Sequence, residues 1–269
     1  MIELPITPLT DHQLFGSPEF PLRGSKLDHI IRCAGSVALT WVKEPTADTL
    51  GGAAAQTGNL VHKAVDGYHT NNNDKEAGDV ALQQARAQFP GGDVKKAQKI
   101  FDAYAADQAN QVTVPYLELK IEASFSPLPD DPLQLPIVIK GTCDQLRLVD
   151  GTLQVWDIKT GGRLTAKEYM DYHMYQVAGY AVAAAQTLQQ PVEPGGLICT
   201  DGYATGQRVR TFAPWDYTVC LYLMRNLVRR VTDIRKGNIE LSPSTVNCEY
   251  CPLKSISNCI PKYKELIRA

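Results

Sequence analysis

The sequence lacks any apolar run long enough to cross a bilayer, so we expect no membrane role. The N-terminal stretch MIELPITPLTDHQLFG also lacks the basic segment and apolar core of a secretory signal, and we expect a cytoplasmic protein. The sequence also has no excess of positive charge: it contains 27 Lys and Arg residues and 29 Asp and Glu residues, so its net charge is −2. Any role in nucleic-acid binding would therefore need a local basic patch or bound metal.

The cysteine usage does not fit a disulfide framework, because the count of seven is odd and the expected compartment is reducing. Three thiols instead crowd towards the C-terminus, at Cys248, Cys251 and Cys259. Clustered thiols of this kind are typical of a metal site or an iron–sulfur centre. Three other cysteines fall within strand or helix patterns and are predicted to be buried apolar residues: Cys143, Cys199 and Cys220.

Helical periodicity dominates the first part of the chain. Residues 1–24 carry four prolines, show no clear period and are predicted to form an extended arm. Apolar spacing then predicts helices, with Ser25 as a candidate N-cap of the first. Their ranges are 25–42, 53–69, 75–89 and 93–110.

Alternating patterns follow and indicate strands. The predicted strands are 116–125, 137–149, 152–159, 196–203 and 207–212, and further helices are predicted over 166–188 and 214–236. The sequence contains no internal repeat and no low-complexity tract. We therefore predict one α/β domain over residues 25–269. Its centre is a small, mixed, mainly antiparallel sheet flanked by helices, with a helical N-terminal part and a Cys-rich C-terminal tail.

The strongest local signal is the Asp150-Gly151 pair between two strand patterns, which predicts a two-residue hairpin turn. This turn sets the register and places Asp144 opposite Asp157 on the neighbouring strand. Because side chains alternate across a strand, one face collects an apolar set that ends in charged residues. The apolar set is Leu146, Leu148, Leu153 and Val155, and the charged residues are Asp144, Asp157 and Lys159.

Two carboxylates that face each other at the edge of an apolar surface repel. A divalent cation such as Mg²⁺ or Mn²⁺ prefers carboxylate oxygens and would remove this conflict. Lys159 lies two residues after Asp157 on the same face, where it could orient a water molecule or stabilise charge on a phosphate. The alternative interpretation is a pair of surface carboxylates with a salt-bridging lysine.

The residues around the hairpin resemble the core of the PD-(D/E)XK nuclease superfamily, in the RecB-like variant where a G-x-x-D strand leads into a D-x-K-T-G strand. The matching segments are G-T-C-D at 141–144 and D-I-K-T-G at 157–161. Two more segments resemble that branch: G-N-L-V-H at 58–62 is similar to its G-x-x-x-H helix, and Q-V-A-G-Y at 176–180 to its Q-x-x-x-Y helix. Each motif is weak alone, but four in order across residues 25–262 make the resemblance fairly specific.

The resemblance implies a restriction-endonuclease-like core with a metal-dependent centre. The implied metal ligands are His62, Asp144, Asp157 and the backbone carbonyl of Ile158. The implied catalytic residues are Asp144, Asp157, Lys159, Gln176 and Tyr180. Lys159 would position the attacking water, and the last two would share a helix face near the DNA strand or Lys159. A glutamate on the first core strand would join the site, either Glu118 or Glu122, and we prefer Glu122.

The resemblance also implies a Mg²⁺- or Mn²⁺-dependent deoxyribonuclease, an exonuclease rather than an endonuclease. Its substrate would be single-stranded DNA or a duplex end in recombination, repair or phage DNA processing, where a protein partner in a recombination or replication complex would fit. Basic residues after Pro214 could follow a DNA backbone or simply form a solvated helix face. They are Arg225, Arg229, Arg230, Arg235 and Lys236. The alternative function is non-catalytic DNA binding on the same fold, stapled by an iron–sulfur cluster or by zinc.

The C-terminal cysteines supply three soft ligands, whereas a tetrahedral zinc or a four-iron cluster needs four. Cys33 is the best candidate for the fourth. One cysteine before the nuclease core and three after it resembles RecB-like enzymes that carry iron–sulfur clusters, including AddB-type and CRISPR-adaptation exonucleases. We therefore expect a [4Fe–4S] cluster that closes the domain, with zinc or plain structural cysteines as alternatives. Its ligands would be Cys33, Cys248, Cys251 and Cys259.

Overall fold

The computed structural model describes residues 14–35, 52–160, 170–200, 203, 210–239 and 242. In this part of the chain, six strands form one sheet in the order β1-β3-β4-β5-β6, with β2 paired to β3 off this path. The strands are β1 (Leu22–Arg23), β2 (Tyr116–Phe125), β3 (Ile137–Val149), β4 (Thr152–Lys159), β5 (Glu193–Cys199) and β6 (Arg210–Phe212). The pairs β1–β3 and β4–β5 are parallel, and the other three are antiparallel. The predicted α/β class with a mixed, mainly antiparallel sheet is confirmed.

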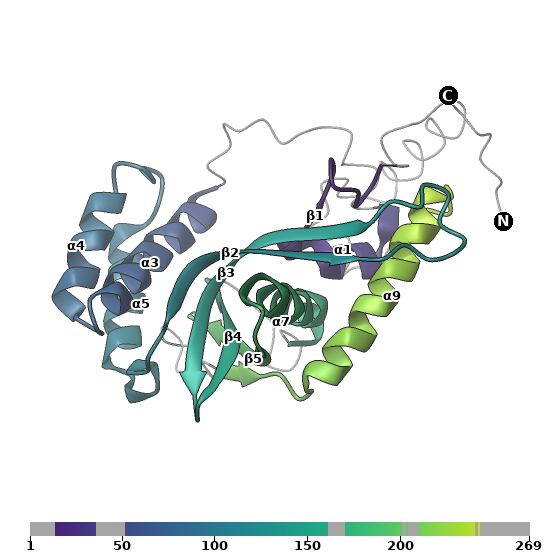
Figure 1. The fold of residues 1–269 in the computed structure, drawn as a ribbon. Helices are drawn as coiled ribbons and strands as arrows, with labels where there is room; N and C mark the ends of the chain where they lie inside the picture. The colour runs from purple at the N-terminus through teal and green to yellow at the C-terminus, as the bar shows by residue number, and fades with distance from the viewer. Residues whose placement is uncertain are drawn as a thin grey trace.

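Helices lie on both sides of this sheet (Figure 1). The helices are α1 (Leu27–Arg32), α3 (Ala53–Thr70), α4 (Lys75–Ala85), α5 (Val94–Ala106), α7 (Met174–Leu188) and α9 (Tyr217–Arg235). Trp156 and Ile158 of β4 pack in an apolar core with α3, α4 and α5, whereas Val155 packs in a second core with α1, α7 and α9. Successive side chains of β4 therefore point to opposite helix layers. None of the described helices is both long and apolar enough to cross a membrane.

The hairpin between β3 and β4 has the predicted turn and register. Asp150 and Gly151 have φ values of 49° and 79°, and two successive positive φ angles are the mark of a type I′ turn. The pairing runs outward from Val149 opposite Thr152, as predicted. One detail differs: Leu148 is 42% exposed, because the tip of the hairpin projects beyond the helices (Figure 1). On this face Leu148 is therefore the exposed member, whereas Leu153 opposite it is buried in the core.

The described part of the N-terminal segment packs into the domain, which corrects the prediction of an extended arm for residues 14–24. Phe15 and Leu22 have no exposed surface, and β1 pairs with Ile139 and Lys140 of β3. Burial of large apolar side chains decides this conformation, although the segment has no periodic pattern. Residues 1–13 lie outside the described part.

The first predicted helix is shorter than its apolar spacing indicated. Residues Gly24–Lys26 form a 3₁₀ turn, α1 starts at Leu27 without a side-chain cap, and Ser25 is therefore not its N-cap. The helix ends at Arg32 because Cys33 adopts extended dihedrals, with φ −155° and ψ 94°. The predicted helices 53–69, 75–89, 93–110 and 214–236 agree to within four residues at their ends, whereas α7 begins only at Met174, after a break at His173. The predicted stretches 36–42, 166–169, 201–202 and 207–209 lie outside the described residues.

Candidate active site

Asp144 and Asp157 lie on neighbouring strands at the end of the hairpin pairing. The last pair of this ladder is Gln145 with Trp156, so the two aspartates occupy the next position of the same register. Asp144 Oδ2 accepts a hydrogen bond from the backbone N–H of Ile158 at 2.7 Å. Asp157 is buried, with 2% of its surface exposed. The hairpin thus brings two carboxylates together in a poorly hydrated place, as the register predicted.

Asp157 forms a closed set of contacts with Lys159 and Gln176. Lys159 Nζ lies 2.7 Å from Asp157 Oδ2, and it also donates a hydrogen bond to Gln176 Oε1 at 3.0 Å. Gln176 Nε2 donates to the other oxygen of Asp157, Oδ1, at 2.9 Å. The amide of Gln176 therefore holds both the carboxylate and the ammonium group. Helix α7, which packs against β4, supplies this amide from its first turn.

Tyr180 lies on α7 one turn after Gln176 and is also buried. A Cβ on Gly141 would come within 3.1 Å of the Tyr180 ring. Burial raises the pKa of the Tyr180 hydroxyl, and the nearby Asp157 and Asp144 raise it further, so it stays protonated and can donate. The two residues of the Q-x-x-x-Y pattern therefore both lie near the aspartates.

A second group of side chains meets Asp144 from the opposite side. His62 of α3, Glu118 of β2 and Asp144 each offer one ligand atom, and these atoms lie within 4.8 Å of one another. His62 Nδ1 is 3.9 Å from Asp144 Oδ2 and 3.9 Å from Glu118 Oε1. The backbone of Glu118 has a φ of +48°, a left-handed conformation that costs energy for a non-glycine residue. Strain of this kind often accompanies a functional side chain.

The glutamate at the site is Glu118 and not Glu122, which corrects our preference. Glu118 lies opposite Asp144, between the pairs Leu117–Gln145 and Leu119–Cys143. Glu122 is four residues farther along β2, about 13 Å away at the usual strand rise. Its side chain is 55% exposed and forms an ion pair with Lys140 at 3.0 Å. The register of β2 against β3 thus excludes Glu122 from the group around Asp144.

A glycine explains how α3 approaches the end of β4. A Cβ on Gly58 would lie 2.2 Å from Thr160 Oγ1, far closer than real atoms come. Any larger residue would push α3 away from the strand. One turn later, α3 carries His62, so the close approach brings the imidazole ring to Asp144. This is the physical reason for a glycine four residues before the histidine.

The electrostatics of the site favour a bound cation. Burial raises the pKa of Asp144 well above its usual range, and the nearby Asp157 raises it further. Burial likewise raises the pKa of Glu118. Burial lowers the pKa of Lys159, but the neighbouring carboxylates outweigh it and the net shift is upward, so the ammonium stays charged. Asp144 and Asp157 thus lie near one charged lysine, and Glu118 adds a further carboxylate beside Asp144, so a divalent cation would offset the negative charge.

His62 is suited to join such a cation as a ligand. Burial lowers the pKa of its imidazole ring, so the ring is neutral at neutral pH with a nitrogen lone pair available. The carboxylate oxygens of this donor set suit Mg²⁺ or Mn²⁺. The carboxylate of Asp157, by contrast, is engaged with Lys159 and Gln176 and lies outside the group formed by His62, Glu118 and Asp144. The role of the Ile158 carbonyl stays a prediction.

The five basic residues after Pro214 do not all lie on one open face of the protein. Arg235 has no exposed side-chain surface and is paired with Asp131. It lies one turn after the buried Val231, so the helical period places it on the inner face of α9. Lys236 is paired with Asp130. Arg225, Arg229 and Lys236 are exposed, and Arg230 is half-buried.

One residue of this region was missed in the sequence. Asp28 of α1 is buried, and its carboxylate accepts hydrogen bonds from the backbone of α7 at Tyr175 and Gln176. The partners are 147 and 148 residues apart in sequence. Local periodicity carries no signal for such a contact. Of the predicted cysteine ligands, Cys33 is buried at the end of α1, and Cys248, Cys251 and Cys259 lie outside the described residues.

Comparison with known proteins agrees with this geometry. The family model described as the PD-(D/E)XK nuclease superfamily matches residues 25–256. The matched range contains β2 to β6 and every described helix named above, and it begins just after β1. No curated protein sequence matches the chain significantly.

Proposed function

The chain belongs to the PD-(D/E)XK nuclease superfamily, and from this premise we propose that it is a Mg²⁺- or Mn²⁺-dependent deoxyribonuclease whose centre comprises His62, Glu118, Asp144, Asp157 and Lys159. The observation that supports it most is the surplus of carboxylates around a charged, restrained lysine. A stable fold has no need of such an arrangement, because like charges at a buried edge cost energy. Phosphodiester hydrolysis needs it, because negative charge must be neutralised while water attacks.

The residues have distinct roles in this proposal. His62, Glu118 and Asp144 would hold the ion, with Asp157 and the Ile158 carbonyl completing its ligands. A bound Mg²⁺ or Mn²⁺ would lower the pKa of a coordinated water and offset charge on the phosphate. Lys159 directs its ammonium group towards the same carboxylates, where it would orient the attacking water and donate to a phosphate oxygen. Gln176 keeps the Lys159 ammonium in place through the 3.0 Å hydrogen bond to Oε1.

The narrower role is an exonuclease of the RecB-like branch, acting on single-stranded DNA or a duplex end in recombination, repair or phage DNA processing. The support is the order of the four sequence motifs and the position of Gln176 and Tyr180 beside the aspartates. A protein partner in a recombination or replication complex fits this role. The competing proposal, a non-catalytic DNA-binding protein, is weakened by the presence of a complete carboxylate and lysine set.

The direct test is cleavage of end-labelled single- and double-stranded DNA with Mn²⁺. We expect the wild type to release labelled products, to stop when a chelator is added, and to leave closed circular DNA intact if it is an exonuclease. Glu118→Gln should weaken cleavage roughly 10-fold or more by removing an ionised ligand. Glu122→Gln is the matched control on the same strand and should be unaffected. DNA binding without any cleavage by the wild type would refute the nuclease proposal and favour the non-catalytic alternative.

We also propose that Cys33, Cys248, Cys251 and Cys259 hold a [4Fe–4S] cluster, with zinc as the alternative. The supporting contact is a hydrogen bond from the backbone N–H of Ser242 to Cys33 Sγ at 3.4 Å. Ser242, which precedes Cys248 by only six residues, therefore lies beside Cys33. The cluster would staple α1 to the C-terminal tail and contribute to folding.

Metal analysis of the purified protein tests this staple. We expect about four iron atoms per chain and a brown colour for a four-iron cluster. Cys251→Ser should lose the iron and lower the melting temperature, because the cluster links distant segments. Cys220→Ser, which changes a buried cysteine of α9, is the control and should keep the iron. Stoichiometric zinc in the wild type would replace the cluster by the alternative, and iron loss without a lower melting temperature would contradict a staple.

A further inference from the structure

Asp28 caps helix α7 from a different helix. Its Oδ1 accepts the N–H of Tyr175 at 2.9 Å and its Oδ2 accepts the N–H of Gln176 at 2.8 Å. These are the second and third residues of α7, whose N–H groups have no partner within the helix. The N-cap residue of α7, His173, supplies no side-chain cap. The carboxylate of α1 therefore does the work that a local Ser or Asp does at most helix starts.

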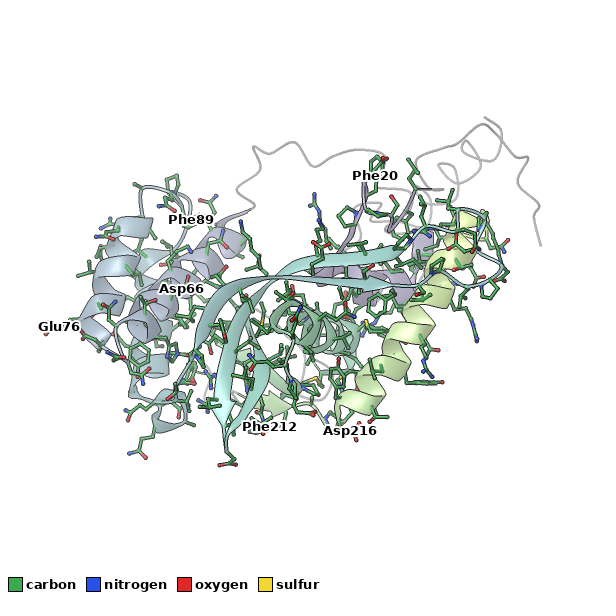
Figure 2. The ribbon with its side chains drawn as sticks, viewed as in Figure 1. Phe20, Asp66, Glu76, Phe89, Phe212 and Asp216 are labelled. Atoms are coloured by element: carbon green, nitrogen blue, oxygen red, sulfur yellow. The ribbon has the colours of Figure 1, made fainter. Side chains whose placement is uncertain are left out.

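The burial of the Asp28 carboxylate costs desolvation free energy. Asp28 is 4% exposed, and burial raises the pKa of its carboxyl to about 7 even though both backbone hydrogen bonds lower it. Folding must therefore offset the desolvation of a charge, whereas an exposed aspartate caps a helix at little cost. A cap of the ordinary local kind is found on α9, where Asp216 accepts a hydrogen bond from its own N-cap position (Figure 2).

The contact leads directly to the candidate active site. The Gln176 N–H bonds to Asp28, and the Gln176 side chain holds Asp157 and Lys159 with hydrogen bonds of 2.9 and 3.0 Å. One residue thus joins the cap to the two groups that the proposed chemistry needs. We propose that Asp28 is a positioning residue of this nuclease, which fixes the first turn of α7 so that Gln176 keeps the Lys159 ammonium in its working position.

The surrounding packing makes α1 a firm support for this task. Arg32, one turn after Asp28, donates to the backbone carbonyl of Asp171 and lies 3.9 Å over the Tyr172 ring. A Cβ on Gly179 would lie 2.4 Å from Leu27 Cδ1, so the two helices are in close contact. Helix α1 therefore contacts α7 and the residues just before it through two polar side chains, Asp28 and Arg32, and one apolar side chain, Leu27. Asp28 is the only one of these that reaches the backbone of Gln176.

Because this inference depends on the proposed nuclease function, its first test is kinetic. Asp28→Asn keeps the shape but turns an amide donor towards one of the two N–H groups. We expect the maximal cleavage rate to fall roughly 10- to 100-fold, as small displacements in active sites do. DNA affinity measured with Ca²⁺ should change less than about twofold. In a Gln176→Ala background, Asp28→Asn should add less than about twofold, because the path through Gln176 is already broken. Full additivity would contradict the proposal.

The second test needs no nuclease activity. Lys159 is 21% exposed and ion-paired, so amine acylation followed by mass spectrometry should label it slowly in the wild type. Both Asp28→Asn and Gln176→Ala should increase this labelling several-fold, while Lys63, 44% exposed, serves as the internal reference. Unchanged Lys159 labelling in Asp28→Asn would overturn the positioning role. If the wild type fails to cut DNA, the nuclease proposal fails, and this labelling still decides the role of Asp28.

A matched helix cap controls for the exchange of aspartate for asparagine itself. Asp216→Asn makes the same exchange at the N-cap of α9 and should change the melting temperature little, because asparagine caps a helix about as well as aspartate. We expect its cleavage rate and Lys159 labelling to stay within about twofold of the wild type. Hydrogen exchange at the start of α7 should increase in Asp28→Asn and not in Asp216→Asn. Equal effects of both variants on Lys159 would assign Asp28 a structural role only.

Discussion

Replacing Lys159 with alanine is expected to lower the rate of DNA cleavage roughly 10²- to 10³-fold, about the loss seen when one charge-stabilising donor leaves an active site. The ammonium group lies 2.7 Å from Asp157 Oδ2 and is held by Gln176. Its pKa is lowered by burial but raised more strongly by the neighbouring carboxylates, so it acts as a cation and not as a base. Alanine removes this positive charge and leaves Asp157 buried without it.

The measurement is the single-turnover rate on end-labelled DNA with Mn²⁺. Lys140→Ala is the control, because Lys140 lies on β3, is half exposed and pairs with Glu122 on the surface. We expect Lys140→Ala to cleave at the wild-type rate. Equal rates for Lys159→Ala and the wild type would show that the ammonium group has no part in the reaction, even if cleavage itself is metal-dependent.

The part of the site that could be predicted from sequence is the part that a short turn controls. Asp150 and Gly151 favour positive φ angles, so they define a two-residue turn and with it every pair of the β3–β4 ladder. No other fold information is needed to place Asp144 next to Asp157. The turn preference of these two residues agrees with the observed sheet, and the predicted register of β3 against β4 is therefore correct residue by residue.

Glu118 shows where this reasoning stops. Residues 126–136 connect β2 to β3, and a connection of this length does not define a register. Glu118 and Glu122 both alternate to the same face of β2, so the pattern could not choose between them. Asp28 is a stronger case, because its partners on α7 are nearly 150 residues away. Such contacts are decided by how helices dock, which composition and periodicity do not describe.

Replacing Arg235 with methionine is expected to lower the free energy of unfolding by about 3–5 kcal/mol, the usual cost of leaving one partner of a buried ion pair alone. Arg235 and Asp131 have no exposed side-chain surface, and Nη1 lies 2.9 Å from Asp131 Oδ2. The guanidinium group also donates to the carbonyls of Phe15, Leu135 and Pro136. It therefore joins the N-terminal segment, the β2–β3 connection and α9, and methionine would leave four acceptors without this donor.

Urea unfolding of Arg235→Met measures this effect, and the chain supplies a closely matched control. Lys236 and Asp130 form an ion pair between the same two segments, one residue away on each, but these side chains are 30% and 66% exposed. Because exposed ion pairs contribute little to stability, Lys236→Met should unfold almost like the wild type. A similar small loss in both variants would mean that Arg235 does not hold these segments together.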